Sequence, residues 1–269
     1  FSANVAAAAL SADSTVANLV FTGASNTFSA ASTLANDGTL QFGDATGDSF
    51  TFNGGLTTSD VGGTVTLNTS ISTSNDALVF GAITLGNNIT LDTNATNTTG
   101  DLTIGAVTGG SNTLTLTTEN NIANADITAS GNISGVTTLT LQNVGGTATF
   151  AGDVDVTTLT VGNTVANVAI NGDGSTVTNT VSFANDGTLQ LADATGDTLT
   201  FNGGVTTTGV GGTVTLNGTI NASDDAITLG AVTLGSNTTV DTNAASTNTA
   251  DLTIGAVTGG SNTLTLSTE

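Results

Sequence analysis

The sequence predicts an all-β protein, specifically a parallel β-helix (β-solenoid). Three observations support this prediction: apolar and polar residues alternate with period 2, turn-forming residues separate the alternating segments, and the chain repeats itself at long range. Alternation with period 2 is typical of strands that bury one side. No segment has the period and caps of an amphipathic helix.

The expected strands are short, and in most of them Thr stands between two apolar residues and faces outward. They include Leu40-Gln41-Phe42, Phe50-Thr51-Phe52, Val65-Thr66-Leu67, Leu78-Val79-Phe80, Leu102-Thr103-Ile104, Leu114-Thr115-Leu116, Leu139-Thr140-Leu141 and Leu159-Thr160-Val161. Turn sequences such as Asn53-Gly54-Gly55 separate them and supply positive φ at tight corners. We expect two strands per coil, about 20–25 residues per coil and on the order of 11–13 coils.

Two copies of one long unit make up the chain. Residues 1–149 form the first unit, and residues 150–269 form a second, incomplete one. The segment that starts at Ala35 reappears at Ala184, and the segment that starts at Leu102 reappears at Leu252, so the second copy has one extra residue between residues 242 and 248. We expect one continuous solenoid over residues 1–269, belonging to a longer array whose coil ends are not capped.

An antiparallel sandwich or barrel is the alternative architecture for many short strands with regular turns. The solenoid is favoured because the apolar positions hold small aliphatic residues or Phe, which fit a narrow stacked core. Asn and Thr recur at the expected corners, where like residues can form ladders. Repetition at two scales also suits a fold in which each coil touches only its neighbours.

The composition excludes most catalytic and nucleic-acid-binding chemistry. The chain has no Lys, Arg, His, Cys or Tyr and a formal net charge of −21. It therefore has no imidazole base, thiolate or Schiff-base amine, and no side chain that neutralises a phosphate backbone. We expect no nucleic-acid partner and no enzymatic activity. Disorder is disfavoured because 37% of the residues are hydrophobic and many are β-branched, and no apolar run is long enough for a membrane helix.

The aspartates are the candidate ligands for a metal ion. Asp44 and Asp48 in the first unit correspond to Asp193 and Asp197 in the second. A hard cation, Ca²⁺ above all, takes carboxylate and carbonyl oxygens as ligands and would bridge either pair. The alternative is that these residues form Asx turns at coil corners and keep the rod soluble. We expect no other cofactor.

The sequence resembles the repeats of giant bacterial surface proteins. Gly110-Ser111-Asn112-Thr113-Leu114-Thr115-Leu116 and Gly131-Asn132-Ile133-Ser134-Gly135-Val136-Thr137-Thr138-Leu139 are similar to those of β-strand-repeat, autotransporter-passenger and filamentous-haemagglutinin-like proteins. The resemblance extends over the whole chain and is one of style. It implies a right-handed parallel β-helix, export, and a role as stalk, adhesin or fibre. It assigns no functional residue.

We therefore expect a structural repeat segment of an exported bacterial cell-surface or extracellular fibre. It would act as a rigid, protease-resistant rod, with copies of itself or adjacent repeats of the same chain as its end-to-end partners. Two alternatives stay open at this point. One is an adhesin stalk that binds a ligand on its own surface, and the other is a β-helical carbohydrate-active enzyme, whose paired carboxylates would need different pKa values.

Overall fold

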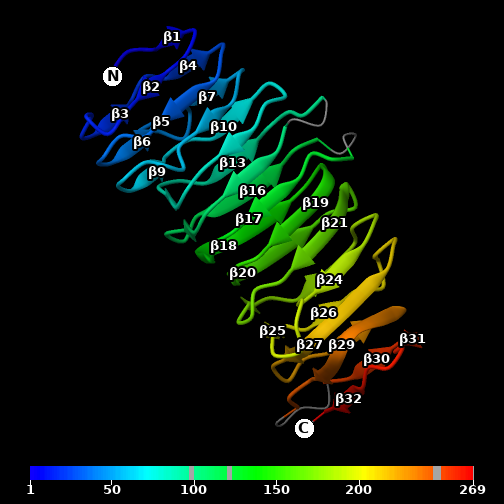
Figure 1. Cartoon of the computed structure of the whole chain (residues 1–269). Helices are drawn as coiled ribbons and strands as arrows, with labels where there is room; N and C mark the ends of the chain where they lie inside the picture. Colours follow the sequence, from blue (N-terminus) through cyan, green and yellow to red (C-terminus); the bar gives the residue numbers. More distant parts are fainter. Residues whose placement is uncertain (97–99, 120–122, 245–249, 269) are drawn as a thin grey trace.

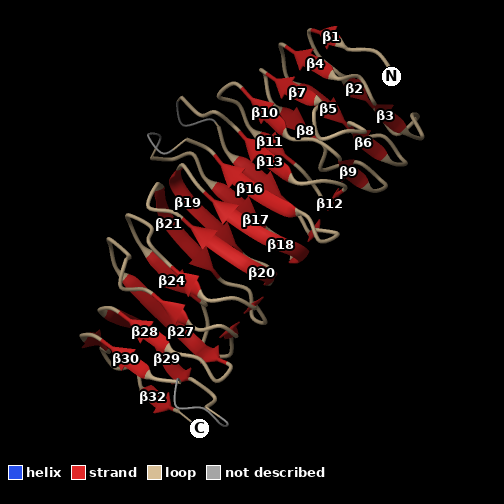
Figure 2. Ribbon diagram, turned by 180° about the vertical axis from the view of Figure 1, so that it is seen from behind, coloured by secondary structure: helices blue, strands red, loops and turns tan. Residues whose placement is uncertain are grey.

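The computed structural model is a β-solenoid of about 11 turns, and it describes residues 1–96, 100–119, 123–244 and 250–268. The turns stack along one axis, with the two ends of the chain at opposite ends of the rod (Figure 1). Every regular element in the described residues is a strand, and no described helix is present that could span a membrane (Figure 2). The all-β, parallel solenoid predicted from the alternation is confirmed.

Three parallel ladders run along the rod, so each turn has three strands. Most strands take part in only one of the three ladders. Face A contains β1 (Ala6–Ala7), β4 (Ser25–Phe28), β7 (Ser49–Phe52), β10 (Ile71–Thr73), β13 (Ile89–Asp92), β16 (Thr113–Thr117), β23 (Val181–Ser182), β26 (Val205–Thr206), β28 (Ile227–Leu229) and β30 (Leu252–Ile254).

The other two faces are built in the same way. Face B contains β2 (Ser11–Ala12), β5 (Ser32–Leu34), β8 (Leu56–Thr57), β11 (Leu78–Val79), β14 (Leu102–Ile104), β17 (Ile127–Ala129), β19 (Val144–Phe150), β21 (Val165–Ile170), β24 (Leu189–Leu191) and β31 (Val257–Thr258). Face C contains β3 (Leu19–Phe21), β6 (Leu40–Phe42), β9 (Val65–Leu67), β12 (Ile83–Leu85), β15 (Val107–Thr108), β22 (Thr176–Val177), β25 (Thr198–Phe201) and β32 (Leu264–Ser267).

Four long strands bend around a corner and serve two faces. β18 (Ile133–Leu141) and β20 (Val154–Val161) pass from face C to face A, whereas β27 (Val214–Ala222) and β29 (Val232–Asp241) pass from face B to face C. Our expectation of two strands per coil is wrong, because the third strand of many turns is only two or three residues long. The turn length is close to expectation: Val65 pairs with Ile83 and Val107 with Ile133, so partners are 18 to 26 residues apart.

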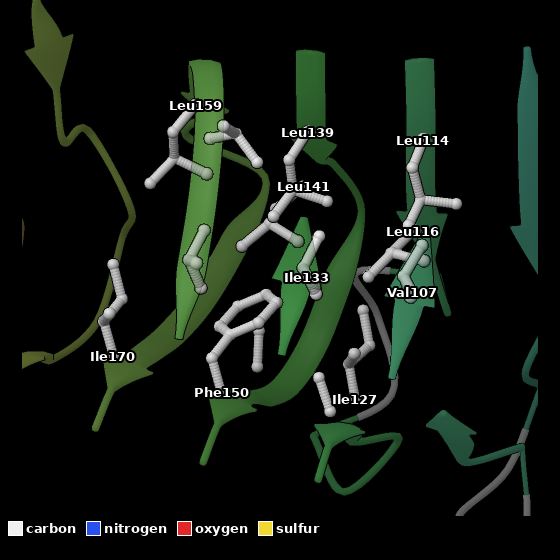
Figure 3. Close-up of a cluster of buried hydrophobic side chains, with 14 of the residues drawn as sticks. Val107, Leu114, Leu116, Ile127, Ile133, Leu139, Leu141, Phe150, Leu159 and Ile170 are labelled. Carbon is white, nitrogen blue, oxygen red and sulfur yellow. The ribbon is translucent and has the colours of Figure 1, made fainter. Parts of the chain in front are cut away.

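The core is a stack of apolar side chains that all point into the rod. Leu114, Leu139 and Leu159 are paired across neighbouring turns and are almost fully buried (Figure 3). The phenylalanines also stack, for example Phe28 on Phe52, with ring centroids 4.8 Å apart. Burial of such side chains stabilises the fold by about 1.5–3 kcal/mol each. The expectation that Phe side chains fit a narrow stacked core is confirmed.

The long sequence repeat does not match a whole number of turns. From β4 on face A, six turns lead to the face A half of β20, and two more strands lead to β22 on face C. β22 is the sequence equivalent of β4. Equivalent segments of the two units therefore lie on different faces, as for Leu40 on face C and Leu189 on face B. Of the segment expected to hold the extra residue, residues 242–248, only 242–244 are described.

Candidate functional site

The four aspartates predicted as metal ligands lie in two equivalent surface turns, each joining two faces. Asp44 and Asp48 lie between β6 and β7, at the corner from face C to face A. Asp193 and Asp197 lie between β24 and β25, at the corner from face B to face C. The structure therefore brings the members of each pair together and places the two pairs at different corners of the rod.

In both turns the second carboxylate accepts hydrogen bonds from the backbone. Asp48 Oδ2 accepts from the N–H groups of Asp44 and Ala45, at 2.9 and 3.2 Å. Asp197 Oδ2 accepts from those of Asp193 and Ala194, at 3.0 and 2.8 Å. A charged acceptor in this position satisfies two N–H groups that a turn would otherwise leave unpaired. The Asx-turn reading thus has a specific geometric basis.

The metal expectation for Asp44, Asp48, Asp193 and Asp197 stays a prediction. Within the described part of the chain, no three Asp, Glu, His or Cys side chains converge as a metal site would require. One oxygen of Asp48 and one of Asp197 already accept N–H groups. A Ca²⁺ ion, which takes six to eight oxygen ligands, would have to be completed by backbone carbonyls and water.

In the second turn, desolvation and a neighbouring carboxyl change the pKa of one aspartate. Desolvation, together with the contact to the Asp197 carboxyl, raises the pKa of Asp193. Asp197 itself is buried, with 8% of its surface exposed. A carboxyl that is desolvated and lies beside another carboxyl holds its proton more readily than an isolated one.

Asp48 also borders a shallow groove on face A that the sequence analysis did not group. The groove, of about 240 Å³, is lined by Asp48, Ser49, Phe50, Ser70, Ile71, Ser72, Thr90 and Asp92. Burial raises the pKa of Asp92. Asp48 and Asp92 are two turns apart in sequence, so only the register of β7, β10 and β13 brings them to one groove.

A second groove, the corner groove, lies where the chain passes from face C to face A. It has a volume of about 330 Å³ and is lined by Ser111, Gly135, Val136, Thr137, Asp155, Val156, Thr157, Thr176 and Thr178. Desolvation is the main cause that raises the pKa of Asp155, whose Oδ1 accepts from the Thr176 N–H at 3.1 Å. The groove therefore offers one recessed carboxyl among several hydroxyl groups.

Unequal turn lengths create the corner groove. β18 and β20 continue around this corner without a loop, and their residues pair only 20 residues apart, as Thr138 does with Thr158. The turn through Ser111 is longer, since Leu114 pairs with Leu139. β18 makes the corner with a bulge between Ser134 and Val136, where Gly135 has a φ of 66°. The glycine within this strand was the available sequence signal, because such residues mark bulges.

Other aspartates connect neighbouring turns at the corners, where they accept hydrogen bonds from backbone N–H groups of the next turn. Asp101 Oδ1 accepts from Asp126 N, Asp126 Oδ1 from Thr147 N, and Asp153 Oδ1 from Gly174 N, at 2.7 to 3.0 Å. Asn88 and Asn237 do the same for Thr113 and Thr263. These side chains therefore have a structural role.

No protein-family model matches this chain, and no curated protein or solved structure is significantly similar to it. The arguments about function consequently rest on the geometry described above.

Proposed function

We propose that this chain is a structural segment of an exported bacterial cell-surface or extracellular fibre, acting as a rigid rod. The observation that carries the proposal is the parallel pairing of strands from turn to turn on all three faces. A ladder of this kind leaves each turn bonded to both neighbours. At about 4.8 Å per turn, about 11 turns give a rod roughly 50 Å long.

The ladder supports the proposed resistance to proteases. Cleavage requires local opening, and opening one turn breaks hydrogen bonds on both sides and exposes its buried Leu, Ile or Phe side chains. Trypsin has no site in the chain, because Lys and Arg are absent. Copies of the chain, or adjacent repeats of a longer one, are the partners that would extend the ladder end to end.

Two measurements test the proposal. Antibodies raised against the purified chain should label the surface of intact cells of the source organism, and proteinase K added to intact cells should remove the label only slowly. Labelling that appears only after the cells are permeabilised would contradict the surface location. Rapid digestion of the purified, folded chain by proteinase K would contradict the rigid rod.

An adhesin stalk with its own binding surface is the second candidate, and the corner groove favours it. Its recessed Asp155 and surrounding hydroxyl groups suit a neutral or cationic ligand that donates hydrogen bonds. Beads coated with the chain should adhere to cells that carry the ligand. If the stalk binds through the corner groove, Thr157→Trp, which fills this groove, should abolish that adhesion. The outward Thr206→Trp on face A is the matched control and should leave adhesion unchanged.

A further inference from the structure

Six threonines form a regular patch on face A, which we call the threonine patch. It consists of Thr113 and Thr115 on β16, Thr138 and Thr140 on β18, and Thr158 and Thr160 on β20. Thr113 pairs with Thr138 and Thr138 with Thr158, and the second row pairs in the same way. No register shift falls within the patch. The three strands lie side by side in the middle of the rod (Figure 1).

The buried side of the same strands fixes the position of the threonines. Leu114, Leu139 and Leu159 alternate with them and stack in the core (Figure 3). The threonines point to the opposite, solvent side, because side chains alternate along a strand. Thr is β-branched and restricted at χ1, which limits the positions of the hydroxyl and methyl groups of the patch. Thr158 Oγ1 also accepts a hydrogen bond from Asn179 Nδ2 at 2.9 Å and keeps its own O–H as a donor.

The resulting grid has two spacings. Neighbouring strands are about 4.8 Å apart, and residues two positions apart on one strand are about 6.6 Å apart. These two repeats approximate the spacings between oxygen atoms on a face of hexagonal ice. No charged side chain lies among the six threonines, although the whole chain carries a net charge of −21.

Face A has a longer uninterrupted row of outward Ser and Thr residues than the other two faces. Every face A strand from β13 to β30 places a Ser or Thr in the row that runs through Thr115, Thr140 and Thr160. Val79, Ala169 and Gln190 interrupt the equivalent row of face B. Asp155, Asn221 and Asp241 interrupt that of face C. A general preference for outward Thr would not distinguish the faces.

We propose that the threonine patch binds ice. Hydroxyl groups at these spacings can take the places of lattice water molecules, and the methyl groups between them favour an ordered water layer over a mobile one. The parallel ladder fixes the register and spacing of the three strands while the crystal face forms against them. This function is independent of the mechanical role proposed above, since a rod can fail to bind ice and still be a rod.

The test uses the 269-residue chain and a single ice crystal as the probe. We expect the unmodified chain to produce thermal hysteresis, a gap between the melting and freezing points of the crystal, and to be enriched in ice grown slowly from solution. Thr140→Tyr, at the centre of the patch, should lose most of both effects. Thr219→Tyr on face C is the matched control, because Thr219 is an equally half-exposed strand residue, and it should retain them.

Thr160→Tyr provides a second variant, at an exposed position that tolerates a large side chain. Circular dichroism should show unchanged melting for all three variants. The proposal is overturned if the unmodified chain gives no hysteresis and no enrichment in ice. It is also overturned if Thr140→Tyr and Thr160→Tyr keep full activity, or if Thr219→Tyr loses as much as they do. Sedimentation that shows dimers of the unmodified chain, dissociated by Thr140→Tyr, together with no ice effect, would assign the patch to a second copy instead.

Discussion

The two acidic turns have nearly the same sequence, yet the corners beside them are built differently. In the first unit the corner is a short loop between two separate strands, β9 and β10. Thr69 lies in this loop, and its Oγ1 donates a hydrogen bond to the backbone carbonyl oxygen of Asp48. In the second unit β27 continues through the equivalent position, with a bulge between Leu216 and Gly218. Gly218, the equivalent of Thr69, has a φ of 64°.

A second residue difference between the two units accompanies that of Thr69 and Gly218. The turn requires a positive φ at residue 43 and at its equivalent 192, which are Gly43, with a φ of 76°, and Ala192, with a φ of 64°. A Cβ on Gly43 would lie 2.8 Å from Thr69 Cγ2. The second unit has no such methyl group, because Gly218 replaces Thr69. The first unit therefore combines Gly43 with Thr69, and the second combines Ala192 with Gly218. We infer from this comparison that the two positions are coupled.

The largest effect should follow from placing the first unit's residue in the second corner. Gly218→Thr would put a β-branched residue at a positive φ, and its Cβ would lie 2.4 Å from Asp197 O. Left-handed strain and overlap with the backbone together should destabilise the chain by about 3 kcal/mol or more. Urea unfolding should show this loss, with a smaller one for Gly218→Ala. An unchanged midpoint for Gly218→Thr would show that the bulge is not needed.

Gly43→Ala should cost about 2 kcal/mol, since it adds left-handed strain and the overlap with Thr69. Thr69→Gly should remove the overlap, so the double variant should be more stable than the sum of the two single losses predicts. A double-mutant cycle measures this coupling, which we expect at about 1 kcal/mol. Strict additivity would contradict the coupling inferred from the two units.

The carboxylate that closes each turn should matter more in the second unit. Asp197→Ala leaves two N–H groups without their charged acceptor at a buried position and should cost about 2 kcal/mol. Asp48→Ala removes the same bonds from a half-exposed position, where water replaces part of the interaction, and should cost about 1 kcal/mol. Thermal melting of both variants, with Asp60→Ala as an exposed control, would compare them. A larger loss of stability for Asp48→Ala than for Asp197→Ala would contradict this prediction.

The sequence predicted the parts of this fold that depend on local pattern. Alternation such as Leu114-Thr115-Leu116 identified the strands and their buried side, and the glycines identified the corners. Three strands per turn were not predicted, because strands such as β8 and β15 have only two residues and are too short to show an alternating pattern. The rotation of the second unit by one face was also missed, since it depends on the sum of all turn lengths. The grooves that contain Asp155 and Asp92 were not predicted, because register over several turns, rather than local spacing, places these residues there.

Acid should stabilise the chain in the range just above the ordinary aspartate pKa. Burial raises the pKa values of Asp92, Asp155 and Asp193 above the ordinary aspartate range, whereas the hydrogen bond from Thr15 lowers the pKa of Asp13. A raised folded-state pKa means that the folded chain binds protons more tightly, so stability is lost as pH rises through that pKa. The Tm should therefore increase by a few degrees when the pH falls from about 6 toward 4. A Tm that falls over this range would contradict the prediction, and Asp193→Asn should reduce the increase.

The smallest effect concerns the residue that the second turn holds under strain. Ala192 has a φ of 64°, which costs an L-residue about 1 kcal/mol and glycine almost nothing. Ala192→Gly relieves this strain but loses part of the gain, because glycine has more freedom to lose on folding. The buried Ala192 methyl group is lost as well. We therefore expect a net stabilisation of a few tenths of a kcal/mol in urea unfolding. If Ala192→Gly instead destabilises the chain by about 1 kcal/mol, the methyl group fills space left by the Gly218 exchange, and packing rather than backbone strain couples the two positions.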